Sequence, residues 1–261
     1  MKREMSVAGS FYPAQSSEIE RYFKHFTQVY DANFKLPQLQ TKAIIVPHAG
    51  YIYSGFSANV AYRVLAQSHV KTFVIIGPSH KVAFYGASMC EYQGYETPLG
   101  ELPSSQELFL KLKESFTFES LQSAHHEHST EVQFPFIKYY FPDAKIIEIV
   151  YGVIESKEIS AIINFLLELQ DVGIIISTDL SHFYTLEEAK KLDSLCIDAI
   201  EYLDINKLHD GCQACGKIGV EAMMLSAKLK GYHAKVLDYR TSADASQDSS
   251  RVVGYMSACF N

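Results

Sequence analysis

The side chains best suited to metal or proton chemistry are gathered in a few short segments of the sequence. The segment VPHAGYIYSG carries His48, and IIGPSH carries His80. STDLSH carries Asp179 and His182, and AHHEHSTEVQ carries several histidines and acids, among them His128. Imidazoles exchange protons near neutral pH and bind transition metals. Several of them in equivalent positions therefore predict a metal or acid–base site.

The runs that precede these segments predict how the side chains are positioned. Residues 43–46, 73–76, 145–151 and 172–177 are short, apolar and β-branched, as in strands that are buried on both faces. The carboxyl ends of such strands open into the crevice where α/β proteins bind ligands. We therefore expect His48, His80, His128 and His182 to share one site. His125 and His126 could belong to it or not, and we assign no role to His25, His69, His209 and His233.

The order of the predicted elements indicates an α/β fold. Helical spacing occurs at 58–66, 105–113, 132–140, 157–169, 186–202 and 218–230, and two further strand-like runs lie at 234–239 and 252–259. This alternation predicts a mixed central β-sheet flanked by helices. Without a repeat or a linker, residues 1–261 are expected to form a single domain. The segment 91–103 contains glycines and prolines and predicts a loop or hairpin, which could act as a lid.

Composition excludes several classes of protein. The chain has 48% hydrophobic and 20% charged residues, which is ordinary globular usage, and no run reaches the roughly 20 apolar residues of a membrane span. A net charge of −7 disfavours nucleic acid as a partner. The first residues contain no apolar stretch typical of an export signal, so we expect a cytoplasmic protein. Five irregularly spaced cysteines favour reduced thiols.

Taken in order, the segments resemble the motif set of one known family. PHAGYIYSG, GPSH, EHSTEVQFPF, STDLSH, the CG of Cys215 and Gly216, and TSADASQDSSRVVGY are similar to the motifs of the Memo family, whose prokaryotic members are often labelled AmmeMemoRadiSam system protein B. The resemblance covers nearly the whole chain. It implies the fold of the class III extradiol dioxygenases, in which two histidines and one carboxylate hold Fe(II) and leave other positions open.

The resemblance also implies a ligand set. His48 and His80 match the two imidazole ligands, and the TSAD segment supplies Asp244 as the third. An oxygen donor makes Fe(II) the first choice of metal and zinc the second, whereas relatives with cysteine at this place would favour copper or zinc. The alternative for Asp244 is a turn residue that caps its own backbone, and Asp248 is its local rival.

Further residues match the surroundings of the dioxygenase metal. His182 resembles the general base, and His128 resembles the second pocket histidine that stabilises a developing anion. Asp179 could orient an imidazole or cap the following helix, and it adds a carboxylate where ring-cleaving enzymes have a glycine-rich turn. The remaining residues assigned to the substrate pocket are Tyr53, for which core packing is the alternative, Glu127 and Cys215.

Cys212 and Cys215 form a CxxC, which can indicate a redox centre or half of a zinc site. No second cysteine pair completes a four-sulfur site, and only Cys215 matches the family motif. We therefore favour Cys215 as a thiol that lines the pocket.

Three functions are compatible with these residues. The first is a non-heme Fe(II)-dependent, dioxygenase-like oxidoreductase that acts on an unknown small substrate. The second is a redox-neutral, metal-dependent hydrolase in which the ion activates a bound water. The third is a non-catalytic metal-binding module that captures a protein partner. Fold does not decide among them.

Overall fold

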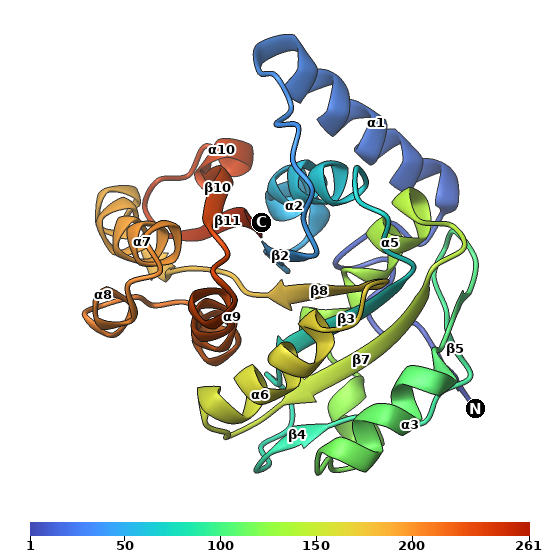
Figure 1. Cartoon of the computed structure of the whole chain (residues 1–261). Coiled ribbons are helices and arrows are strands. Elements are labelled where there is room, and N and C mark those ends of the chain that lie inside the picture. The colour runs from blue at the N-terminus through green and yellow to red at the C-terminus, as the bar shows by residue number, and fades with distance from the viewer.

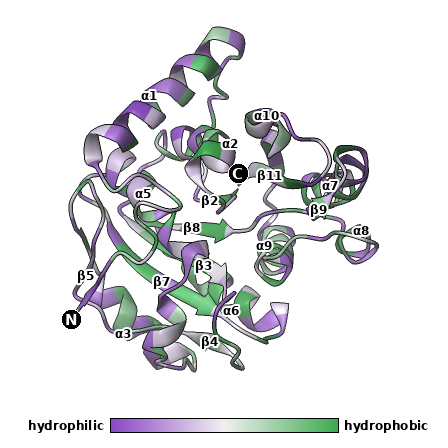
Figure 2. Ribbon diagram, turned by 180° about the vertical axis from the view of Figure 1, so that it is seen from behind, coloured by the Kyte–Doolittle hydropathy of each residue, from purple (hydrophilic) through white to green (hydrophobic).

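A large mixed sheet runs through the centre of the molecule (Figure 1). The computed structural model describes residues 1–261. Four parallel strands lie side by side in the order β2 (Ala43–Val46), β8 (Val172–Ser177), β3 (Thr72–Pro78) and β7 (Lys145–Tyr151). These strands are almost entirely buried, and β7 and β8 are green in Figure 2, as expected for strands covered on both faces.

Antiparallel strands extend this parallel core at both edges. Beyond β2 lie β11 (Val252–Phe260) and then β10 (Ala234–Thr241), and beyond β7 lies β4 (Ala87–Ser88). The short β9 (His182–Tyr184) pairs with β11. The expectation of an α/β fold with a mixed central sheet flanked by helices is therefore confirmed.

Helices cover the two faces of the sheet in separate layers. One core contains α1 (Ser16–Asn33), α2 (Tyr51–Leu65) and α5 (Phe134–Tyr140), packed on Phe73 and Ile75 of β3. The other contains α3 (Gln106–Ser115), α6 (Ser156–Leu167), α7 (Leu186–Glu201) and α9 (Lys217–Lys230), packed on Val74 and Ile76. Successive side chains of β3 thus enter opposite cores, as the period of a strand requires.

A small second sheet holds the N-terminus in place. β1 (Lys2–Arg3) pairs in parallel with β5 (Gly94–Tyr95), which pairs antiparallel with β6 (Leu102–Pro103). β5 and β6 confirm the hairpin predicted at 91–103. The remaining elements are short: η1 (Gln122–His125), α4 (His128–Glu131), α8 (Ile205–His209) and α10 (Ala243–Ser246).

Two helices differ from the prediction. α2 begins at Tyr51, whereas the sequence predicted a start at residue 58. Most of this helix is buried, so it lacks the polar face by which its first turns could have been recognised in the sequence. α1 was not predicted at all, although Ile19, Phe23, Phe26 and Tyr30 form its buried face at helical spacing.

The expectation of five reduced thiols is wrong for one pair. Cys196 of α7 forms a disulfide with Cys212, and Cys90, Cys215 and Cys259 are free. The two bonded cysteines are 16 residues apart and come together only because α7 turns back through α8, which sequence spacing does not reveal. Cys212 is therefore not a partner of Cys215 in a CxxC. Among the helices, none combines the length and the apolar character needed to cross a membrane.

Candidate metal centre

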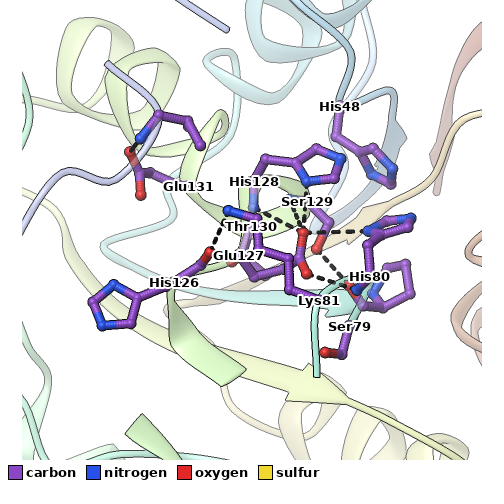
Figure 3. A network of polar contacts seen from close by, with 12 residues as sticks. His48, Ser79, His80, Lys81, His126, Glu127, His128, Ser129, Thr130 and Glu131 are labelled. Atoms are coloured by element: carbon purple, nitrogen blue, oxygen red, sulfur yellow. Dashed lines mark hydrogen bonds and ion pairs between the residues drawn. The ribbon is translucent and has the colours of Figure 1, made fainter. Parts of the chain in front are cut away.

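Three imidazoles converge at the carboxyl ends of the parallel strands (Figure 3). His48 follows β2, His80 follows β3, and His128 begins α4. Their candidate ligand atoms all lie within 4.8 Å of one another. The ring centroid of His48 lies 5.2 Å from that of His80 and 5.4 Å from that of His128. The centroids of His80 and His128 are 4.6 Å apart.

One buried carboxylate orients two of these rings. Oε1 of Glu127 lies 3.2 Å from Nδ1 of His80 and 2.7 Å from Nδ1 of His128. The backbone N–H groups of His80 and His128 also donate to this carboxylate, at 2.6 and 2.8 Å. Because both Nδ1 atoms face a carboxylate, each Nε2 is left with its lone pair, which is the common arrangement behind metal-bound histidines.

A hydroxyl performs the same task for His48. Nδ1 of His48 lies 3.0 Å from Oγ of Ser177, the last residue of β8. That hydroxyl donates its own proton to the carbonyl oxygen of Ser129 and accepts from the Gln133 amide at 3.1 Å. Ser177 must therefore accept from His48, so Nδ1 of His48 carries the proton and Nε2 carries the lone pair.

The electrostatics keep His48 neutral and Glu127 ionised. Burial, followed by the nearby imidazoles of His80 and His128, holds the pKa of His48 well below its usual range. Burial alone would raise the pKa of Glu127, but hydrogen bonds from His128 and His80 outweigh it and lower that pKa strongly. Metal binding requires a neutral imidazole, and His48 is held in that form.

Two motif glycines allow the supporting segments to approach closely. A Cβ on Gly77 of GPSH would lie 2.8 Å from Oγ of Ser129 and 2.9 Å from Cγ2 of Thr130, so β3 packs directly on α4. A Cβ on Gly216 would lie 2.7 Å from the carbonyl oxygen of Ser177. A side chain at either position would collide with these atoms, so both positions require glycine.

The third member of the histidine group differs from the expected ligand set. The group contains His128 and not Asp244. Oδ2 of Asp244 accepts from the backbone N–H and the hydroxyl of Thr241, at 2.8 and 3.2 Å, which is the turn role left open as its alternative. The rival Asp248 is exposed and accepts from Ser250 in the same way.

Other expected site residues lie around His48. Oδ1 of the buried Asp179 accepts from the backbone N–H of His48 at 2.7 Å, and Oδ2 lies 4.0 Å from its Nε2. Burial raises the pKa of Asp179. His182 is near enough for its charge to lower the pKa of His48. Sγ of Cys215 lies 3.2 Å from Nε2 of His48, and burial raises the pKa of this thiol to about 12.

Two residues assigned to the substrate pocket have different surroundings. Glu127 has no exposed surface, and its carboxylate is occupied by imidazoles and backbone amides, so it supports the site from behind. Tyr53 is 40% exposed and lines a hollow of about 470 Å³ together with Phe11, Gln15 and Ile52. Phe11 also packs on His128, with ring centroids 4.6 Å apart.

The donor set fits a transition-metal ion. Imidazole nitrogen suits zinc, copper, iron and nickel, whereas calcium and magnesium prefer oxygen. His48 is buried, while the side chain of His80 is 32% exposed, so the group can be reached from solvent on the His80 side. Fold and site together define an α/β protein with a three-histidine group that could hold one metal ion.

The chain belongs to the Memo family: the family description "Memo-like protein" matches residues 3–259. It is 33% identical to a MEMO1 family protein of Archaeoglobus fulgidus over 99% of both chains. It is 34% identical to one of Methanobrevibacter smithii over 100% of both, and 35% identical to one of Methanosarcina acetivorans over 97% of both. The resemblance seen in the sequence motifs is thereby confirmed along the full length.

Proposed function

We propose that this chain is a mononuclear metal-dependent enzyme whose ion is held by Nε2 of His48, His80 and His128. One observation carries the proposal. All three Nδ1 atoms face protein acceptors, Glu127 for two rings and Ser177 for the third, and one candidate ligand atom of each ring lies within 4.8 Å of the others. Imidazoles that only stabilise the fold have no need of three lone pairs directed at one point.

The reaction we propose is oxidation of a small substrate by dioxygen with Fe(II) bound. The Memo motifs resemble the class III extradiol dioxygenases, and three protein ligands leave positions open for oxygen and substrate. The ion would supply the redox chemistry and lower the pKa of a bound hydroxyl. His182 and Asp179 would take up the proton that the substrate releases. Tyr53 would contact the substrate from the neighbouring hollow.

A second candidate is zinc-dependent hydrolysis, which the all-histidine donor set favours. Three histidines with one open position are a known arrangement of catalytic zinc, in which the bound water has its pKa lowered to about 7. In this reaction Asp179, 4.0 Å from Nε2 of His48, would accept the proton of the water. A non-catalytic role would need only the three imidazoles and neither His182 nor Asp179.

Elemental analysis tests the site. Protein purified without oxygen or chelator should contain close to one iron or zinc per chain. His48→Ala and His128→Ala should lose it, whereas Asp244→Ala should retain it. Loss of the ion in Asp244→Ala with retention in His128→Ala would restore the ligand set predicted from sequence. A wild-type chain that takes up no ion on loading would exclude the proposal.

Oxygen consumption then separates the two reactions. Iron-loaded protein should consume oxygen with a small phenolic or enolic substrate, and His182→Ala should do so much more slowly. Turnover that persists under strict anaerobiosis and with zinc would favour the hydrolase. Full metal content without turnover in either assay would favour metal handling.

A further inference from the structure

Asp193 of α7 is a buried acid to which the proposed reaction assigns no role. Its side chain has no exposed surface. Oδ1 accepts from the backbone N–H of Ser181 at 2.9 Å, and Oδ2 accepts from the hydroxyl of Tyr239 at 2.7 Å. Both donors are neutral, and a neutral amide of the same shape could bond to both. Since burying a charge is costly, hydrogen bonding alone does not account for a carboxylate at this position.

A glycine of β11 makes room for this carboxylate. A Cβ on Gly254 would overlap Oδ2 of Asp193 and lie 2.6 Å from its Cγ. The backbone of the same glycine also holds the STDLSH segment. Its carbonyl oxygen accepts from the N–H of Leu180, and its N–H donates to the carbonyl oxygen of Ser181, both at 2.9 Å. Asp193 and Gly254 together therefore fix the backbone directly ahead of His182.

The backbone directly after His182 is held in an unfavourable conformation. Phe183 has a φ of 67°, in the left-handed region that bulky residues rarely adopt. Its ring is 61% exposed, and the guanidinium carbon of Arg251 lies 4.6 Å from the ring centroid. The strand β9, which begins at His182, is also paired with β11. Such a conformation persists where the surrounding contacts over-determine the backbone, and it is concentrated at functional sites.

Few charges act on the His182 imidazole. Asp179 and His48 do so from the side of the histidine group, Asp193 does so from α7, and Arg251 lies over the adjacent ring. Burial raises the pKa of Asp193, whereas its hydrogen bonds and a charge on His182 lower it. Because the attraction between two charges is mutual, the ionised carboxylate of Asp193 favours the protonated form of the ring.

We propose that Asp193 is a positioning residue for His182, which fixes the turn that carries the imidazole and stabilises the ring once it is protonated. The inference rests on the proposed function, in which His182 takes up a proton from the substrate. The proton passes from the substrate hydroxyl to a ring nitrogen, the oxygen keeps the electron pair of the broken bond, and no electrons are transferred. The carboxylate of Asp193 offsets the new charge on the ring.

Nuclear magnetic resonance of the full chain tests this role. The imidazole signals of His182, assigned by their loss in His182→Gln, are followed through a pH titration with and without zinc. In Asp193→Asn the midpoint should lie below that of the wild type by about half a pH unit or more, because the amide keeps the hydrogen bonds and removes the charge. Asp198→Asn makes the same change at a partly exposed position of the same helix and should leave the midpoint unchanged.

The reciprocal variant provides a test that does not depend on the folding of Asp193→Asn. His182→Gln changes a partly exposed side chain and should raise the titration midpoint of the Asp193 carboxyl, because an attractive charge is lost. An equal His182 midpoint in wild type and Asp193→Asn, or an Asp193 midpoint unaffected by His182→Gln, would overturn the positioning role. Absence of zinc binding by the wild-type chain would overturn the proposed metal site instead, and the metal-free titration would still decide the role of Asp193.

Discussion

Two buried carboxylates, Glu127 and Glu148, hold histidines of the same segment but leave them in different states. Glu127 engages Nδ1 of His80 and His128, and neither Nε2 of these rings has a hydrogen-bond partner in the protein. Glu148 engages Nδ1 of His125 at 2.7 Å, and Nε2 of that ring lies 3.0 Å from Oγ of Ser88. The rings of His80 and His128 can therefore each bind a ligand through Nε2, whereas both nitrogens of His125 already have partners in the protein.

The surroundings of Glu148 explain the difference. His125 and Glu148 have no exposed surface, and the nearly buried Arg3 lies 3.7 Å from the same carboxylate. Ser88, His125 and Glu148 even have the order of a hydroxyl–imidazole–carboxylate triad, but Ser88 also accepts from the backbone of Leu121 and no substrate can reach it. A histidine–carboxylate pair therefore indicates function only when the second ring nitrogen is unpaired and reachable.

The largest effect should come from Glu148→Gln. The substitution leaves protonated His125 buried without its counter-charge and removes one of the two carboxylates that face Arg3, the other being Glu131, so the free energy of unfolding should fall by about 3–5 kcal/mol. Urea unfolding measures the change. The metal content of the folded fraction should stay the same. A loss below about 1 kcal/mol would show that the cluster around Glu148 contributes little stability.

Glu127→Gln should affect the metal instead. Both His80 and His128 lose the acceptor that fixes their tautomer, so affinity for zinc should fall by about 10–100-fold. Competition with a chromophoric chelator gives the constant, and circular dichroism checks that the variant is folded. Equal affinity in wild type and Glu127→Gln would contradict the role of this carboxylate.

The ion pair between His125 and Glu148 should make the melting temperature depend on pH. Burial opposes the charge on His125, but the Glu148 carboxylate prevails and raises the pKa of His125 to about 9. Since the unfolded value is near 6.5, this stabilisation is complete below about pH 6.5 and is lost as pH rises through about 9. The melting temperature should fall over that range. In His125→Asn it should start lower and depend less on pH, and parallel curves for the two proteins would refute the assignment.

Ser177→Ala should have the smallest effect. It removes the acceptor of Nδ1 of His48 but leaves His80 and His128 in place, so zinc affinity should fall by about tenfold, at the low end for a supporting residue. Ser226→Ala, which removes a buried hydroxyl bonded to Ser160 away from the site, is the matched control and should leave zinc affinity unchanged. The same loss in both variants would point to general destabilisation.

The central strands could be predicted because short β-branched runs are unambiguous when both faces are buried. The helix at Ser16–Asn33 also has a signal in the sequence, since Ile19, Phe23 and Phe26 repeat at helical spacing. The disulfide could not be predicted, because nothing local brings Cys196 and Cys212 together.

The meeting of His48, His80 and His128 followed from their places after the strands. The contacts of Asp244 could not be predicted, because family likeness favoured it as a ligand while the fold places its carboxylate on Thr241. Ser177 ends a predicted strand, and nothing in its neighbourhood shows that its hydroxyl meets a ring 129 residues away. For Glu127 a signal existed, since it directly precedes His128.

The absent side chain of Gly77 has a consequence for which ions the proposed metal site can accept. Contact between β3 and α4 at this residue, together with the shared carboxylate, fixes the spacing of His80 and His128. His48 is held separately, by Ser177 and Asp179. A fixed spacing between two ligands discriminates among ions by their radius. The proposed site should therefore bind small first-row cations and reject larger ones such as Ca²⁺.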